Sequence, residues 1–305
     1  MKGFTIVVGA AVGVGLLALI GEYYGSTYTA SAEAPIGRPV KNAASFAAPS
    51  LPNSRDGGGV VALNLSASNT VVYRSEVDAL SVARAQRELL EKSRALGGGE
   101  PLYLVLDTPG GSIDAGNQLI DTAKSLGRPV HTITIFAASM GFYMVQRLGT
   151  RYVLPSGRLM AHRARVGGVG GQVPGEFITA ASTILASVTK IEKQNALRLG
   201  ISFADYTDLV RDEYWVDGED AVRQNAADKL ASIQCDKSLE GTYTETVQSF
   251  FGPVSLIWAR CPAITLPLGF GFEGTEENRQ KVREALVNYR ALRKSGALGA
   301  GLGSL

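Results

Sequence analysis

An apolar segment, "LYLVLD" at 102–107, limits the folds open to this chain more than any other feature of its sequence. A strand with one face in water alternates apolar and polar residues, whereas a strand buried on both faces is apolar almost throughout. Strands of the second kind belong to parallel sheets that are covered by helices. We therefore expect 102–107 to be a central strand of a parallel sheet.

Strand and helix patterns alternate on both sides of this segment. The pattern predicts further strands at 60–65, 70–74, 130–136, 151–154 and 158–162, and helices at 75–96, 112–126, from about 139, and at 174–199. Such alternation is typical of an α/β layer fold, and we expect this unit to span 60–231. The chain has 305 residues and is 45% apolar, which suffices for a full core.

The N-terminus has a different composition. Lys2 precedes an uncharged apolar run at 4–20, which predicts a signal peptide or a membrane anchor within 1–32. Small residues favour cleavage after Ala32, and an uncleaved anchor through 4–20 is the alternative. Either way, we expect the body of the protein in the periplasm or outside the cell, free or held at the inner membrane. Residues 33–59 are rich in Ala, Ser, Pro and Gly and predict a flexible linker.

Residues 232–305 are expected to form an extension with an amphipathic helix at 276–296. The only two cysteines, Cys235 and Cys261, lie in it. In an exported protein such a pair predicts a disulfide, and two buried thiols are the alternative. A metal site would need more ligands, so we expect no metal and no cofactor.

The charges give no sign of a nucleic-acid partner. The 30 basic and 28 acidic residues leave a net charge of +2 and are spread along the chain. Nucleic-acid binding would call for basic residues clustered on one face or one segment. We therefore expect none.

A serine stands in the segment "FAASMGFY" at 136–143, where a helix is expected to open. Ser139 is either a nucleophile or a small residue at a close helix contact. A serine hydroxyl needs a base to take its proton, and the chain has only two histidines. His131 begins the strand that leads to Ser139, so it should lie too far away and be structural. His162 ends the strand expected at 158–162 and is the better base, because active groups gather at strand ends in α/β folds.

The segment "DTPGGS" at 107–112 joins the central strand to a helix. Its proline fixes the turn, and its two glycines permit close approach of the backbone. Free amides at such a turn suit an anionic oxygen that develops during a reaction. A plain strand-to-helix turn is the alternative interpretation.

Four segments occur in the order "DTPGGSIDAG", "AASMG", "LPSGRLMAH" and "GGVGGQ". In this order and spacing the chain resembles the proteolytic subunit of the Clp protease over about 60–230. The resemblance implies a Clp/crotonase-like spiral of ββα units with a long protruding helix. It also implies a serine endopeptidase that acts on peptides or proteins and assembles as a homo-oligomer.

The resemblance assigns roles to individual residues. Ser139 would be the nucleophile and His162 the general base, while the amides of Gly111 and Met140 would form the oxyanion hole. The family places an acid before an aromatic residue and a Ser-Ala-x-Glu-Ala-like segment. Residue type favours Asp212 and spacing favours Glu213, and we take Asp212 first.

The family works as stacked rings fed by a cytoplasmic ATPase. An exported protein would meet no ATP, which argues against an ATPase partner here. We expect an extended substrate with apolar or small side chains next to the cleaved bond.

The sequence leaves two alternative functions open. A serine–lysine peptidase, similar to signal-peptide peptidases, would use Lys190 or Lys193 on the long helix as its base. A non-catalytic scaffold tethered to the membrane would have lost the nucleophile or the base, and this sequence keeps both Ser139 and His162.

Overall fold

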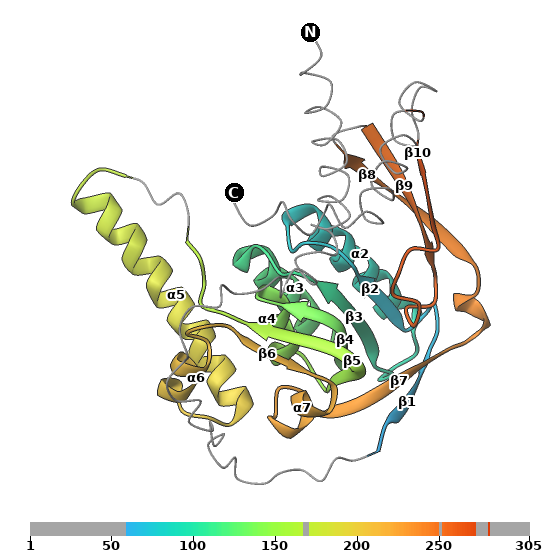
Figure 1. Cartoon of the computed structure of the whole chain (residues 1–305), viewed down its shortest axis with the longest axis horizontal. Coiled ribbons are helices and arrows are strands. Elements are labelled where there is room, and N and C mark those ends of the chain that lie inside the picture. Colours follow the sequence, from blue (N-terminus) through green and yellow to red (C-terminus); the bar gives the residue numbers. More distant parts are fainter. Residues whose placement is uncertain (1–58, 167–170, 250–251, 273–279, 281–305) are drawn as a thin grey trace, which may run out of the picture. The chain divides into compact units, whose positions relative to one another are not determined.

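The computed structural model describes residues 59–166, 171–249, 252–272 and 280 (Figure 1). The chain divides into two compact units, of which the larger covers Pro39–Glu240 and contains all candidate catalytic residues. The predicted signal or anchor, the linker up to residue 58, and the helix at 276–296 apart from residue 280 lie outside the described residues.

The larger unit is built on a seven-stranded sheet with the spatial order β1-β7-β5-β4-β3-β2, in which β6 also pairs with β5. All pairings are parallel except the antiparallel pairing of β6 with β5. The strands are β1 (Val61–Leu65), β2 (Thr70–Tyr73), β3 (Leu102–Thr108), β4 (Val130–Ala138), β5 (Arg151–Ala161), β6 (Tyr214–Asp217) and β7 (Lys229–Cys235). The predicted parallel α/β fold is therefore confirmed.

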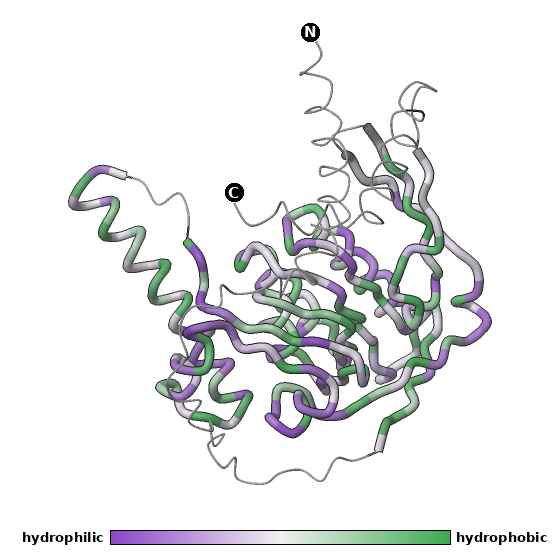
Figure 2. Tube along the Cα trace, viewed as in Figure 1, coloured by the Kyte–Doolittle hydropathy of each residue, from purple (hydrophilic) through white to green (hydrophobic). Residues whose placement is uncertain are grey.

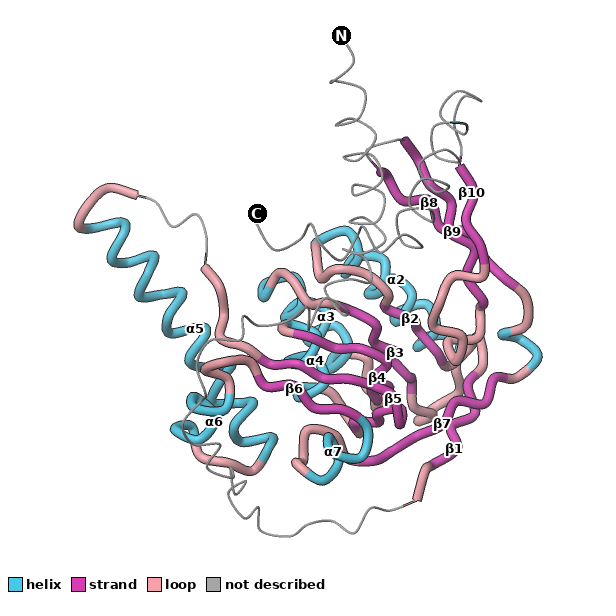
Figure 3. The backbone as a smooth tube through the Cα atoms, viewed as in Figure 1, coloured by secondary structure: helices cyan, strands magenta, loops and turns pink. Residues whose placement is uncertain are grey.

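Helices connect these strands, as Figure 3 shows. They are α2 (Ala79–Ala95), α3 (Ile113–Ser125), α4 (Met140–Arg147), α5 (Gly175–Leu199), α6 (Phe203–Leu209) and α7 (Gly218–Arg223), followed by a 3-10 helix, η2 (Lys237–Leu239). Side chains cap several of the N-termini: Asp78 accepts from the N–H of Ser81 at 2.7 Å, and Ser112 caps α3. Such caps satisfy backbone donors that have no partner inside the helix.

The central strands carry the core (Figure 2). Leu104 and Leu106 of β3 are fully buried, as is Val105 between them, so both faces of this strand are covered. This confirms 102–107 as a doubly buried strand, and it explains why the segment is apolar as far as Leu106, before Asp107.

One predicted pair of strands is a single element. We expected separate strands at 151–154 and 158–162, but β5 runs from Arg151 to Ala161. Its pairing with β4 jumps, because Thr134 pairs with Val153 and Phe136 pairs with Arg158. The intervening segment "LPSG" forms this irregularity. It is the reason why the sequence predicted two separate strands. His162 follows directly after the strand.

Helix α5 projects from the rest of the larger unit (Figure 1). Only Asn195, Ala196 and Leu199 are buried along its length, and all three lie in its last turns. This bears out the predicted long protruding helix. It ends at Gly200, which adopts the left-handed conformation that favours glycine at a helix C-terminus.

A buried ion pair joins β5 to the start of β7. Arg151, whose side chain is 1% exposed, donates to Asp228 Oδ1 at 2.8 Å, and its backbone N–H donates to Asp228 Oδ2 at 2.9 Å. The strand β7 continues beyond the expected boundary at 231, because β1 pairs with it as far as Cys235.

The smaller unit contains a three-stranded antiparallel sheet in the order β10-β9-β8. Its strands are β8 (Thr242–Ser249), β9 (Gly252–Ala259) and β10 (Gly269–Phe272). Neither cysteine is free, since Cys235 and Cys261 are both disulfide-bonded. Among the residues that the structure describes, no helix combines the length and the apolar character that a membrane span requires.

Candidate active site

Ser139 occupies a sharp turn between β4 and α4. Its backbone has φ 54° and ψ −115°, which is rare for a residue other than glycine. The turn is held from both sides, because the Ser139 N–H donates to the Met160 carbonyl at 2.8 Å and the Tyr143 N–H donates to the Ser139 carbonyl at 3.2 Å. Strained serines at strand-to-helix turns are a feature of nucleophile elbows, where the hydroxyl is presented at the edge of a sheet.

The glycine turn predicted at 107–112 lies against this serine. A Cβ placed on Gly110 would be 2.6 Å from Ser139 Cβ and 2.9 Å from the Met140 nitrogen. The turn is fixed by two bonds with Val77, whose N–H donates to the Gly110 carbonyl and whose carbonyl accepts from Ser112, each at 2.7 Å. The two glycines are needed for this close approach, since both have positive φ.

The amides of Gly111 and Met140 are both placed at this junction. Met140 is the first residue of α4, so its N–H has no partner within the helix. Gly111 pairs with Val77 in an isolated parallel bridge. The two hydrogen bonds of this bridge use the Gly110 carbonyl and the Ser112 N–H, so the Gly111 N–H takes no part in it. Two unused donors beside a serine can stabilise an anionic oxygen.

A cavity of about 690 Å³ brings the candidate residues together. Its wall includes Ser139, His162, Gly111 and Met140. In the described part of the chain, neither the Ser139 hydroxyl nor the His162 ring makes a side-chain hydrogen bond, so both are available to a substrate. Hydrogen bonds between catalytic groups often tighten only when substrate is bound.

The two candidate acids differ in position. The antiparallel pairing of β5 and β6 ends at Ala161 and Tyr214, so His162 and Glu213 lie just beyond the paired residues, and the Glu213 backbone has φ 71°. The Glu213 carboxylate accepts from the Trp215 indole N–H at 3.0 Å. Arg165, which lines the cavity, is 3.8 Å from the same carboxylate.

Neither Asp212, which we placed first from the sequence, nor Glu213 lines the cavity. The side chain of Asp212 is 88% exposed and lies 3.5 Å from Arg211 Nε. Among the described residues, neither carboxylate makes a hydrogen bond or an ion pair with His162, and Glu213, with a side chain that is 41% exposed, is the less exposed of the two.

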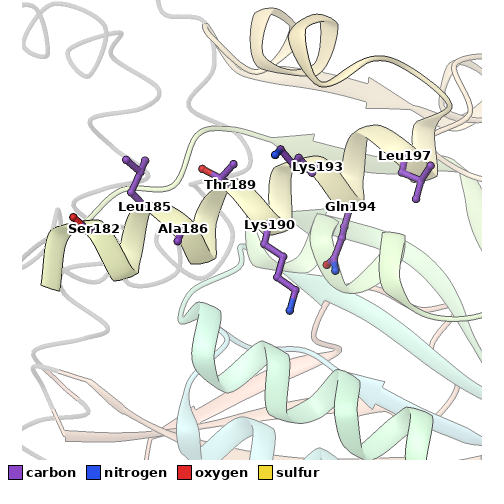
Figure 4. Close-up of a pocket in the computed structure, with 8 residues that line it drawn as sticks. All are labelled: Ser182, Leu185, Ala186, Thr189, Lys190, Lys193, Gln194 and Leu197. Carbon is purple, nitrogen blue, oxygen red and sulfur yellow. The ribbon is translucent and has the colours of Figure 1, made fainter. Parts of the chain in front are cut away.

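The lysines of the alternative serine–lysine mechanism line a different cavity. Lys190 and Lys193 line a second cavity of about 710 Å³ along α5, together with Leu185 and Leu197 (Figure 4). Neither lysine lines the cavity that holds Ser139. The Lys193 ammonium instead lies 5.5 Å from the centre of the Phe203 ring.

His131 lies at the opposite end of β4 from Ser139. Its Nδ1 accepts from the Thr150 N–H at 2.9 Å, and its ring packs against Tyr103 and Tyr152. Burial lowers the pKa of this imidazole. These contacts give His131 a structural role.

A buried ion pair supports the strand that carries the glycine turn. Asp107 closes "LYLVLD" and accepts from Arg74 Nε at 3.0 Å. Burial raises the pKa of the Asp107 carboxyl, and the Arg74 guanidinium acts in the opposite direction. Within the described residues, no group of three or more His, Cys, Asp or Glu side chains could hold a metal ion.

Comparison with known proteins decides the family. The profile of the Clp protease family matches residues 60–234, more than half of the chain. This chain belongs to the Clp protease family. Two curated relatives named ATP-dependent Clp protease proteolytic subunit come from Streptococcus pyogenes serotype M5 (strain Manfredo) and Streptococcus equi subsp. equi (strain 4047). Each is 30% identical over 132 residues, which are 42% of this chain and 67% of the relative.

Membership of the Clp protease family makes the chain a serine-type peptidase, a hydrolase. Its parallel sheet with connecting helices agrees with the Clp/crotonase-like fold that the sequence led us to expect. The matched region ends one residue before Cys235, so the smaller unit has no counterpart in the match.

Sequence reasoning missed part of the cavity wall of this Clp-family chain. Glu192 and Asn195 of α5 line the cavity beside Ile191. The available signal was that these two residues are three apart, and therefore on one face of the helix, in the stretch of α5 that contains its buried positions. Only the packing of α5 in three dimensions shows that this face meets the cavity of Ser139.

Proposed function

We propose that this protein is a serine endopeptidase in which Ser139 attacks the substrate carbonyl and His162 is the general base. The observation that carries the proposal is the shared cavity, which holds both side chains and the two residues with unused amides, Gly111 and Met140. No metal or cofactor takes part in the steps that we propose.

The reaction follows from this placement. His162 takes the proton of Ser139 as the hydroxyl adds to the peptide carbonyl, and the Gly111 and Met140 amides hold the negative oxygen. Protonated His162 then gives the proton to the leaving amine, and the acyl-serine remains. Water, deprotonated by His162, hydrolyses this ester and restores the serine.

We propose Glu213 as the acid that orients His162 and stabilises its cation, with Asp212 as the alternative. The lower exposure of the Glu213 side chain, 41% against 88% for Asp212, and its hydrogen bond from Trp215 support this choice. The bonds from Trp215 and Arg165 would hold the carboxylate in place until the imidazolium forms.

The setting of the enzyme is also a proposal. We propose a homo-oligomer that acts on protein substrates, in keeping with the Clp protease family. An exported location, with or without an anchor at 4–20, rests on the sequence alone. ATP dependence is a property named for the Streptococcus relatives, and an exported chain would have no ATPase partner.

Labelling with a fluorophosphonate tests the catalytic proposal directly. We expect one modification, at Ser139, that is absent from Ser139→Ala and strongly slowed in His162→Gln. Mass spectrometry of the labelled peptide locates the site. A folded protein that takes up no label at Ser139 would support the scaffold function instead.

A further inference from the structure

Helix α5 lines the cavity of Ser139 with both apolar and charged side chains. Ser187, Val188 and Ile191 contribute a largely apolar surface, and Glu192 adds a carboxylate beside it. Helix α4 is held to α5 near this wall, because the Tyr143 hydroxyl donates to Gln194 Oε1 at 2.8 Å. A side chain that enters beside Ser139 would therefore meet both apolar surface and a negative charge.

The Glu192 carboxylate has no hydrogen-bond partner and no ion-pair partner in the described part of the chain. It is nevertheless half-buried. Burial raises the pKa of this carboxyl, and the charge of Arg163 opposes the rise without coming within ion-pair distance. A carboxylate that is partly removed from water without a cation at ion-pair distance is costly. A substrate cation would offset this cost.

One turn further along α5, Asn195 offers a second acceptor. Its side chain is 4% exposed, and its Nδ2 donates to the Tyr206 hydroxyl at 2.9 Å. Its Oδ1 has no hydrogen-bond partner in the described residues. The other side chains in the wall that carry a formal charge are Asp114 and Arg165, and Arg165 already pairs with Glu213.

We propose that this cavity binds the side chain of a substrate lysine or arginine, with Glu192 as its counter-charge. The residue concerned is the one whose carbonyl Ser139 attacks, so the inference rests on the proposed peptidase function. The aliphatic stem of a lysine or arginine would pack on Val188 and Ile191 while its charged end reaches Glu192. This differs from the apolar or small side chains that we expected from the sequence.

Matched fluorogenic peptides that differ only in this residue test the proposal. Wild-type protein should cleave the lysine peptide with a kcat/KM about ten to a hundred times that of the leucine peptide, the range expected for a charge-assisted contact. Glu192→Gln keeps the size of the side chain and should bring the two values within about threefold. Glu219→Gln on α7 removes the same charge outside the cavity and should leave the preference unchanged.

A charge reversal gives an independent check. Glu192→Lys should shift the preference from the lysine peptide to a glutamate peptide. Phosphonate esters that carry a lysine-like or a leucine-like side chain supply a second readout, since they label Ser139 without needing turnover. The lysine-like probe should label wild-type protein faster, and Glu192→Gln should remove this advantage.

The two proposals can fail separately. Equal or better cleavage and labelling with leucine in the wild type would overturn the basic-side-chain proposal and leave the peptidase function standing. An unchanged lysine preference in Glu192→Gln would also overturn the role of Glu192. Absence of any label at Ser139, from these probes or from a fluorophosphonate, would overturn the peptidase function and this inference with it.

Discussion

Replacement of Gly110 by alanine should inactivate the enzyme while the fold persists. The new methyl group would lie 2.6 Å from both the Ala138 carbonyl oxygen and Ser139 Cβ. Ordinary contacts begin near 3.4 Å, so the glycine turn and the serine turn would have to separate by about 0.8 Å. Neither neighbour can yield by rotating a flexible side chain, because one is backbone and the other is the Cβ of the nucleophile.

The expected loss follows from this displacement. A misplacement of about 1 Å at a reacting group reduces the rate by roughly a hundredfold, so we expect kcat/KM for a peptide to fall by about that factor. The backbone has φ +95° at Gly110, and alanine there adds strain of about 1–2 kcal/mol. Domains of this kind are stable by about 5–15 kcal/mol, so the variant should remain folded.

Gly127→Ala is the matched control. Gly127 also has a positive φ, +69°, but a methyl group there would meet nothing within 4 Å. It shares the backbone strain and lacks the clash. We would measure kcat/KM with a fluorogenic peptide and the free energy of unfolding in urea for wild type and both variants.

Gly110→Ala should lose about 1–3 kcal/mol more stability than Gly127→Ala because it alone carries the clash, and only Gly110→Ala should lose activity. A folded Gly110→Ala protein with kcat/KM within threefold of wild type would refute the close packing of the glycine turn on Ser139. An equal loss of activity in Gly127→Ala would refute the argument that the clash, rather than the strain, is responsible.

Four further outcomes are expected. Asp228→Ala should lower the free energy of unfolding in urea by about 3–5 kcal/mol at pH 7, because it leaves the buried Arg151 cation without its counter-charge. Burial alone would raise the pKa of Asp228, but the hydrogen bonds and charge of Arg151 outweigh it and the pKa is lowered. This stabilisation should therefore be complete above the unfolded pKa near 3.8 and decline as the pH falls toward the folded pKa, so that wild type and variant converge in urea titrations at low pH. Glu213→Gln should reduce kcat by ten- to a thousandfold in a peptidase assay, and Asp212→Asn should leave it within threefold; the reverse order would restore Asp212 as the acid. Lys190→Met should keep full peptidase activity, whereas inactivation would revive the serine–lysine mechanism.

Much of the architecture can be predicted from local sequence patterns. The uninterrupted apolar run at 102–107 predicts a strand covered on both faces, and Leu104 and Leu106 are fully buried. The glycine turn after it and the serine before α4 are also recognisable, because tight turns and helix starts depend on neighbouring residues. The spacing of the apolar residues and the identity of the turn residues were therefore enough to predict the parallel α/β fold.

Other features depend on residues that are distant along the chain. The fold leaves the side chain of Asp212 88% exposed and that of its neighbour Glu213 41% exposed, a difference that the local sequence does not predict. The packing of α5 turns Glu192 toward the cavity of Ser139 and leaves Lys190 in another cavity. The sequence by itself determined the strands, the turns and the Ser139 and His162 candidates, since these follow from local periodicity and residue type. Only the tertiary structure decided which face of α5 meets them, because helix packing is set by contacts across the fold.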